Sequence, residues 1–123
     1  MRPRSAKAKG KRLQNKVTKL LQEKYSSVLE EGDFKSTTMG EHGMDVQLSP
    51  SARKVFPFAI ECKNQEALNV WKSYEQAEAN SGNHEPILFI KRNNQKPLVV
   101  VDAEYFVNLH NRVAKEYDID EIL

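Results

Sequence analysis

Three charged residues, Asp45, Glu61 and Lys63, have the types and spacing that metal-assisted hydrolysis requires. Glu61 and Lys63 lie two positions apart within residues 58–63, an apolar run typical of a β-strand. Because side chains alternate between the two faces of a strand, both project from one face, and the opposite face turns toward a core. That core face carries Phe58, Ile60 and Cys62.

Asp45 lies on an earlier run, residues 44–48, in which apolar and polar residues alternate as in a strand. If the two strands pair as neighbours, Asp45 meets Glu61 on a shared polar face. Two nearby carboxylates repel each other unless a cation lies between them, and such oxygen ligands favour Mg²⁺ or Mn²⁺. A divalent cation stabilises charge on a phosphoryl oxygen, and Lys63 adds a positive charge beside it. The alternative is an ordinary cross-strand salt bridge on a solvated face.

The N-terminal part of the chain is strongly basic. Eight basic residues and no acidic residue precede Glu23, whereas the remaining 11 basic residues are outnumbered by 17 acidic ones. The net charge of +2 therefore conceals a basic segment attached to an acidic body. Such a segment suits a polyanion, because each lysine or arginine near a phosphate releases a condensed counterion. The alternative is a solvated tail that aids solubility.

Periodicity and turn signals predict the elements that position these residues. Residues 1–10 have little to bury and predict a mobile arm, and a helix with an apolar stripe begins at Lys11. The stripe comprises Leu13, Val17, Leu20 and Leu21, with Val28 and Leu29 as an extension. Four strands and two helices follow: strands over 44–48, 55–63, 86–91 and 97–101, a helix over 67–80, and a last helix that Asp102 caps.

This order of elements predicts a single α/β domain, residues 11–117, built on a mixed β-sheet and followed by a short tail, residues 118–123. The length of 123 residues allows one modest core. A single cysteine, Cys62, excludes an internal disulfide framework and a multi-cysteine zinc site. No run approaches the roughly 18 apolar residues of a membrane helix, and no signal peptide is recognisable. We therefore expect a cytoplasmic protein that does not bind membranes.

The pattern of an aspartate followed by E-x-K resembles the motif of the PD-(D/E)XK nucleases. The motif consists of Gly43-Met44-Asp45 and, after a short connection, Ile60-Glu61-Cys62-Lys63-Asn64-Gln65. The wider chain, over residues 9–110, resembles small Holliday-junction resolvases of the archaeal type and short endonuclease-like proteins of tailed bacteriophages. The features that carry this wider resemblance are Lys9-Gly10, Ser36-Thr37-Thr38 and Gln76. The resemblance implies a restriction-endonuclease-like core, a central mixed sheet flanked by helices.

The resemblance also implies roles at matching positions. Asp45 and Glu61 would bind Mg²⁺, with Mn²⁺ as a substitute, and Cys62 would offer its backbone carbonyl. Lys63 would be the catalytic lysine, and Gln76 would belong to the same site. Resolvases usually carry a glutamate four residues after the helix glycine, where this chain has Gln14. Gln14 can act through its amide oxygen without contributing charge, or it can be a simple helix-flank residue.

Residues in three segments are candidates for contact with DNA phosphates. The basic segment contributes Arg4, Lys7, Lys9, Lys11, Arg12 and Lys16. The loop hydroxyl groups of Ser36 and Thr37 can donate to phosphate, or they can cap the loop. Arg53 and Lys54 lie in the connection between the two site strands.

Three functions are compatible with these features. The first is a metal-dependent endonuclease that cuts branched DNA, most simply a Holliday-junction resolvase, acting as a homodimer because symmetric resolution needs two cuts. The second is a nuclease that acts on duplex, flap or single-stranded DNA. The third is a DNA-binding module that keeps the scaffold without turnover. If the protein is phage-encoded, its compartment is the bacterial host cytoplasm.

Overall fold

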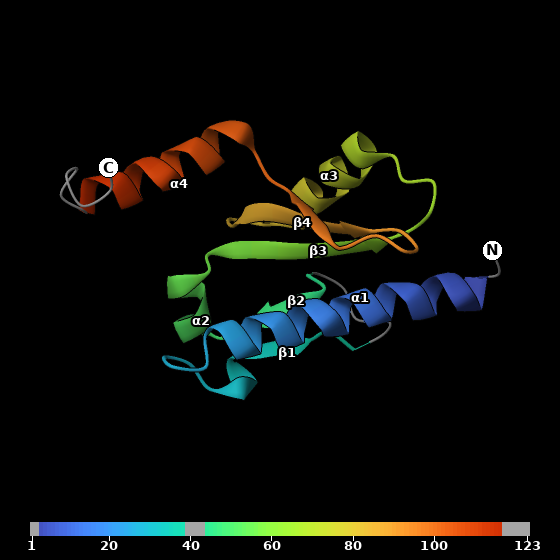
Figure 1. The fold of residues 1–123 in the computed structure, drawn as a ribbon, viewed down its shortest axis with the longest axis horizontal. Coiled ribbons are helices and arrows are strands. Elements are labelled where there is room, and N and C mark those ends of the chain that lie inside the picture. The colour runs from blue at the N-terminus through green and yellow to red at the C-terminus, as the bar shows by residue number, and fades with distance from the viewer. Residues whose placement is uncertain (1–2, 39–43, 117–123) are drawn as a thin grey trace.

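The computed structural model describes residues 3–38 and 44–116. They form a central sheet with α1 (Pro3–Lys24) on one side and α3 (Val70–Ala79) and α4 (Ala103–Glu116) on the other (Figure 1). The predicted tail, residues 118–123, lies outside the described part of the chain, as do Gly43 and the side chain of Arg4. None of the described helices is long and apolar enough to cross a membrane.

The sheet has five strands in the order β1-β2-β3-β4-β5. They are β1 (Phe34–Ser36), β2 (Val46–Leu48), β3 (Phe58–Asn64), β4 (Glu85–Lys91) and β5 (Leu98–Val100). β3 and β4 are parallel, whereas the other neighbours are antiparallel. The predicted mixed sheet and α/β class are therefore confirmed. The three-residue β1 was not predicted, because its alternation is too short to stand out from the adjacent turn.

Helix α1 begins earlier than its apolar stripe indicates. Residues 3–10, expected as a mobile arm, are helical, with Pro3 at the first position, where a proline is well tolerated. The Nδ2 atom of Asn64 donates to the Lys9 carbonyl at 2.9 Å and ties this segment to β3. Leu13, Val17 and Leu21 are buried against the sheet. Leu20 instead is exposed, and the helix ends at Lys24, before the predicted extension.

The predicted connection between the two site strands is a helix, α2 (Pro50–Val55). Ser49 caps it by accepting a hydrogen bond from the Ala52 N–H, and Pro50 occupies the first turn. Ser followed by Pro, read as a strand breaker, is equally a helix start signal. Arg53 and Lys54 therefore lie on a helix rather than in a hairpin loop.

Helices α3 and α4 begin at side-chain caps. The Oδ1 of Asn69 accepts from the Lys72 N–H, and the Oδ2 of Asp102 accepts from the Tyr105 N–H at 2.9 Å, as predicted for Asp102. α3 buries Ala77 and Ser73. Trp71, in the first turn of the same helix, is 83% exposed.

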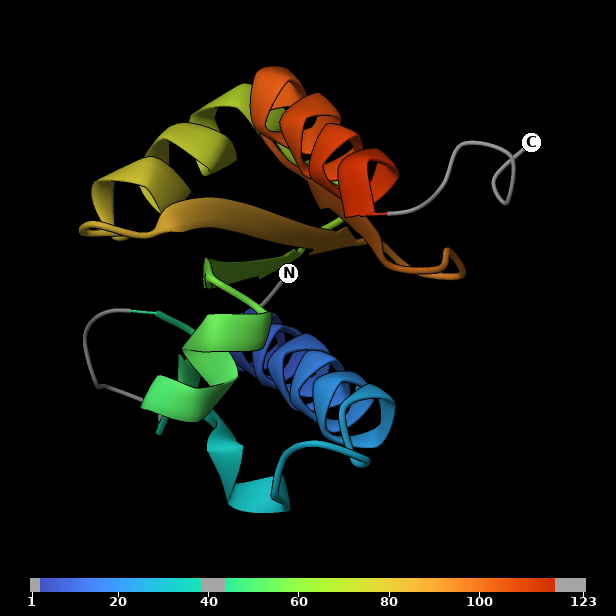
Figure 2. The same cartoon turned by 90° about the vertical axis from the view of Figure 1, so that its left-hand side faces the viewer.

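The core lies between α1 and the sheet. Its largest fully buried side chains include Phe34, Val46 and Ile60, one from each of the first three strands. Phe58, Ile60 and Cys62 belong to this core, as the alternation of β3 predicts. The view turned by 90° also shows α1 on one side of β3 and β4, with α3 and α4 on the other side (Figure 2).

Candidate active site

A cavity of about 390 Å³ opens where the N-terminal half of α1 meets the ends of β2 and β3. It is lined by Lys7, Gly10, Lys11, Gln14, Thr37, Thr38, Asp45, Glu61, Cys62 and Lys63. The two carboxylates, the lysine and the glutamine expected at a hydrolytic site thus share one cavity. These residues come from four segments separated along the chain, and the pairing of β2 with β3 joins them.

Asp45 is fixed to β3 by its backbone and by its side chain. Its N–H donates to the Ile60 carbonyl at 2.9 Å, and its Oδ2 accepts from the Cys62 N–H at 2.7 Å. Burial raises the pKa of Asp45, while the Cys62 N–H and the charges of Lys63 and Lys11 act in the opposite direction. The carboxylate is therefore fixed in position, and its burial disfavours the charged form.

Glu61 lies beside Asp45 and is 7% exposed. Burial and then the nearby charge of Asp45 raise its pKa, while Lys63 and a hydrogen bond with Asn80 lower it. The Nζ of Lys63 lies 3.9 Å from Oε1 of Glu61. The two carboxylates thus repel each other, and the charge of Lys63 compensates in part.

Asn80, at the end of α3, is a site residue that the sequence analysis did not select. Its side chain interacts with Glu61, although Asn80 is exposed and does not line the cavity, like Gln76 one turn earlier. Asn80 follows Gln76 on the same stripe of α3. The register of α3 against β3 decides which of the two reaches the site, and sequence periodicity does not define that register.

We expect the metal-free protein to lose stability as the pH rises through the folded pKa values of Asp45 and Glu61. Both folded pKa values are raised, so the native state binds more protons than the unfolded chain between the unfolded and folded values. Stability in EDTA is therefore highest below this window, falls across it and stays low above it. Urea unfolding at about pH 4, near the unfolded pKa values, and at about pH 7.5 would check this against the Asp45→Asn/Glu61→Gln double variant, which should lose less stability. An identical change in both proteins would contradict the prediction.

The donor set fits a hard divalent cation. Asp45 and Glu61 supply carboxylate oxygens, and a cation between them would relieve their repulsion. The Cys62 carbonyl faces the same edge of β3 as the Cys62 N–H, because both groups of a strand residue point to one neighbour. Among the described residues, no group of three or more His, Cys, Asp or Glu side chains could hold a metal. Burial raises the pKa of the Cys62 thiol, which stays neutral in the core.

Gln14 fastens α1 to β1 at the edge of the cavity. It is 9% exposed, and its Nε2 donates to the Thr37 carbonyl at 2.7 Å and to the Ser36 Oγ at 2.9 Å. The Nζ of Lys11 donates to the same two groups, at 2.7 and 3.1 Å. Because these bonds occupy the amide nitrogen, only the amide oxygen of Gln14 is available to the cavity. A glutamate at this position could accept from the Ser36 hydroxyl but could not donate to the Thr37 carbonyl.

We expect Gln14→Glu to destabilise the metal-free protein by roughly 1–3 kcal/mol, the usual cost of a buried polar atom without a partner, because one oxygen of the new carboxylate would lack a donor. The Thr37 carbonyl itself keeps its bond from Lys11. The substitution places a carboxylate oxygen against the Thr37 carbonyl, where the wild-type amide donates. Gln22→Glu is a matched control in the same helix, because Gln22 also donates to backbone carbonyls but at a more exposed position. Urea midpoints in EDTA would compare the two variants. Equal, small losses would show that the Gln14 bonds contribute nothing specific.

The other predicted DNA-contact residues occupy several places. Lys7, Lys11 and Thr37 line the cavity, although the hydroxyl of Thr37 donates to the Met44 carbonyl. Ser36 does not line it and accepts the hydrogen bonds described above. Lys54 is exposed on α2.

Arg53 turns toward the end of β2. Its Nη2 lies 3.7 Å from the Sδ of Met44. Its Nη1 is buried without a hydrogen-bond partner among the described residues. Lys9, Arg12 and Lys16 lie on the opposite flank of α1, in a different cavity.

An α/β fold that brings an aspartate and an E-x-K lysine to the ends of two central strands defines the class of PD-(D/E)XK nucleases. The sequence model of one family, described as phage putative PDDEXK endonuclease, matches residues 5–122. The chain belongs to this family, which confirms the resemblance to PD-(D/E)XK nucleases and to short phage endonuclease-like proteins. No curated protein and no solved structure matches the chain significantly.

Proposed function

We propose that this protein is a divalent-metal-dependent DNA endonuclease that resolves branched DNA, with four-way junctions as its main substrate, as a homodimer in the bacterial host cytoplasm. The observation that carries the hydrolytic role is the pair of carboxylates, half-buried Asp45 and buried Glu61, with Lys63 beside them in one open cavity. The choice of branched DNA rests on the resemblance to junction resolvases.

Asp45, Glu61 and the Cys62 carbonyl are the groups that would hold Mg²⁺ or Mn²⁺. When bound there, the cation supplies Lewis-acid stabilisation of the negative charge on the scissile phosphate. Hydrolysis forms a phosphorus–oxygen bond to water and breaks one phosphate ester bond, and the leaving oxygen takes up a proton. Asp45 is suited to orient the cation, because the Cys62 N–H fixes its carboxylate at 2.7 Å.

Lysine side chains complete the proposed site. Lys63 places a positive charge beside Glu61, where the phosphate would gain charge during hydrolysis. Lys7 and Lys11 line the same cavity from α1 and would attract the DNA backbone. Lys11 also bonds to Ser36 and Thr37, so it is positioned before DNA arrives.

The homodimer follows from the chemistry of resolution, since two symmetric cuts require two sites. Apolar side chains on the outer surface support association: Phe106 and Val107 of α4 are 50% and 63% exposed, and Leu98 and Val99 of β5 are 54% and 50% exposed. Sedimentation equilibrium of the purified protein, alone and with a junction, would show whether two copies assemble. A monomer in both conditions would contradict the dimer.

The test of the function is cleavage of an end-labelled four-way junction beside its matched linear duplex, with Mg²⁺, Mn²⁺ or EDTA. Paired symmetric cuts on the junction, lost in EDTA, would support the full proposal. Equal cutting of the duplex would support nuclease activity but contradict the preference for junctions. Metal-independent binding without products would favour the non-catalytic DNA-binding module, for which Gln14 in place of an acid is the supporting observation.

A further inference from the structure

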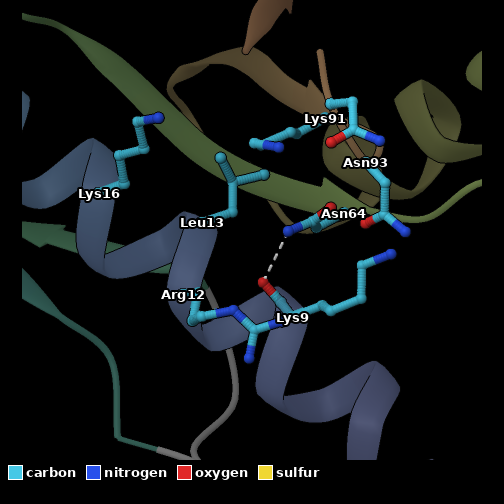
Figure 3. Close-up of a pocket in the computed structure, with 8 residues that line it drawn as sticks. Lys9, Arg12, Leu13, Lys16, Asn64, Lys91 and Asn93 are labelled. Carbon is cyan, nitrogen blue, oxygen red and sulfur yellow. Dashed lines mark hydrogen bonds between the residues drawn. The ribbon is translucent and has the colours of Figure 1, made fainter. Parts of the chain in front are cut away.

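A second cavity, of about 430 Å³, lies on the flank of α1 opposite Lys7 and Lys11 (Figure 3). Residues from α1, β3, β4 and the turn after β4 line it: Lys9, Arg12, Leu13, Lys16, Asn64, Lys91, Asn93 and Asn94. Its volume lies within the range of about 300–1,000 Å³ that small-ligand pockets occupy. Four of the eight lining residues are cationic, and none carries a carboxylate.

The positive charge of this cavity is only partly compensated. Glu66, outside the lining, lies 3.4 Å from the Nζ of Lys9 and also accepts from the Asn93 N–H at 2.7 Å. These contacts fix the position of Lys9 and the turn that forms one wall. Lys16 and Arg12 are exposed, and Lys91 is half-buried. A concave site that gathers like charges in this way attracts anions, and phosphate oxygens accept hydrogen bonds from several cationic donors at once.

Asn64 provides a second, independent feature of the same cavity. Its side chain is 8% exposed, and its Nδ2 donates to the Lys9 carbonyl at 2.9 Å, which fixes the orientation of the amide. Its Oδ1 is buried and lacks a hydrogen-bond partner among the residues that the structure describes. A buried acceptor without a donor is costly. A water molecule that accompanies a phosphate can donate to this oxygen and to the phosphate at once.

We propose that this cavity binds a non-scissile phosphodiester group of the DNA that the candidate active site cuts. Lys9, Arg12, Lys16 and Lys91 hold the phosphate oxygens, and Asn64 binds its hydration water. This inference rests on the proposed function for the identity of the nucleic acid. Lys63 and Asn64 are consecutive in β3, and they serve the two cavities on either side of α1.

The separation of the cavities indicates which phosphate is bound. A helix with its side chains is about 10–12 Å across, and one DNA strand advances about 3.4 Å per nucleotide along the axis. The second phosphate therefore belongs to a position a few nucleotides from the scissile bond. Its contact orients the strand and carries no bond-breaking role, so we expect it to affect affinity more than the chemical step.

The test is the salt dependence of DNA binding in Ca²⁺, measured by fluorescence anisotropy with a labelled junction and its matched duplex. We expect Lys16→Gln/Lys91→Gln to reduce the slope of log K against log salt by about 1.8 on duplex, since each lost lysine–phosphate contact removes about 0.9. Lys72→Gln/Lys115→Gln, at exposed positions on α3 and α4, is the matched control and should keep the wild-type slope. Thermal unfolding would establish that both variants fold.

Two results would overturn the inference: equal slopes for the two double variants, or no binding of DNA by the wild-type protein. Binding is measured without cleavage, so the outcome is separable from the proposed catalytic activity. A reduced slope together with an absence of cleavage in Mg²⁺ and Mn²⁺ would retain the phosphate site and refute the nuclease. Normal cleavage with unchanged slopes would support the nuclease and refute the phosphate site.

Discussion

Replacing Asp45 by asparagine should lower the single-turnover rate of DNA cleavage by about 10³-fold, which corresponds to about 4 kcal/mol of transition-state stabilisation. Asp45 is one of two carboxylates in the cavity, and the loss of its charge would weaken the binding of a divalent cation. The amide oxygen of asparagine can still accept from the Cys62 N–H, so the strand geometry should survive. DNA affinity in Ca²⁺ should change little, because the basic residues of α1 are untouched.

The same substitution should not destabilise the metal-free protein. Asp45 is among the groups that raise the pKa of Glu61, and a neutral amide removes that repulsion. We therefore expect an unfolding midpoint in EDTA at least as high as that of the wild type at neutral pH, which separates lost chemistry from lost folding. Glu116→Gln, at an exposed position at the end of α4, is the control for removing an acid elsewhere. Wild-type cleavage by the Asp45 variant would show that the site lies elsewhere.

The alternation of side chains was sufficient to predict that Asp45, Glu61 and Lys63 lie together. In β3, a strict period of two separates Phe58, Ile60 and Cys62 from Glu61 and Lys63, and burial of that face produces the expected core. Asp45 then reaches Glu61 because β2 pairs with β3, which short connections between strands favour. These are local rules, and they hold wherever one face of a strand is buried.

The contacts that sequence analysis missed join distant segments of the chain. The interaction of Gln14 with Ser36 and Thr37 requires β1, a three-residue strand without a recognisable pattern. The interaction of Asn80 with Glu61 requires the register of α3 against the sheet. Likewise, the helical state of residues 3–10 is fixed in part by a hydrogen bond from Asn64. Periodicity describes which face of an element is apolar but not which neighbour it meets.

The position of α1 explains why its basic residues divide into two groups. Lys7, Lys11 and Gln14 recur at helical spacing on one flank and line the cavity of the candidate active site, whereas Lys9, Arg12 and Lys16 recur on the other flank. Burial of Leu13 and Val17 between the flanks holds the helix against the sheet. Of these cations, Lys7 and Lys9 were expected on a mobile arm, and the helical state of residues 3–10 places them in different cavities.

Replacing Lys63 by methionine should reduce the cleavage rate by about 10²–10³-fold, the range measured when one group that stabilises developing charge is removed from an active site. Methionine keeps an unbranched side chain of similar length, so packing beside Glu61 should be retained. The side chain of Lys63 is 21% exposed, and its Nζ lies 3.9 Å from Glu61, so it is well placed to meet a phosphate that enters the cavity. Lys63→Arg should not restore the full rate, because a planar guanidinium cannot place a compact charge at the same point.

Two measurements assign Lys63 to the chemical step. The single-turnover cleavage rate of the variant at saturating protein should fall, and its Kd for DNA in Ca²⁺ should change little. Lys115→Met, on the exposed surface of α4, controls for the loss of one positive charge and should leave both quantities at wild-type values. A weaker Kd with an unchanged rate would make Lys63 a phosphate-binding residue rather than a catalytic one. The electrostatic reason for expecting a rate effect is its position: Lys63 lowers the pKa of Glu61, so its charge already acts where the two carboxylates meet.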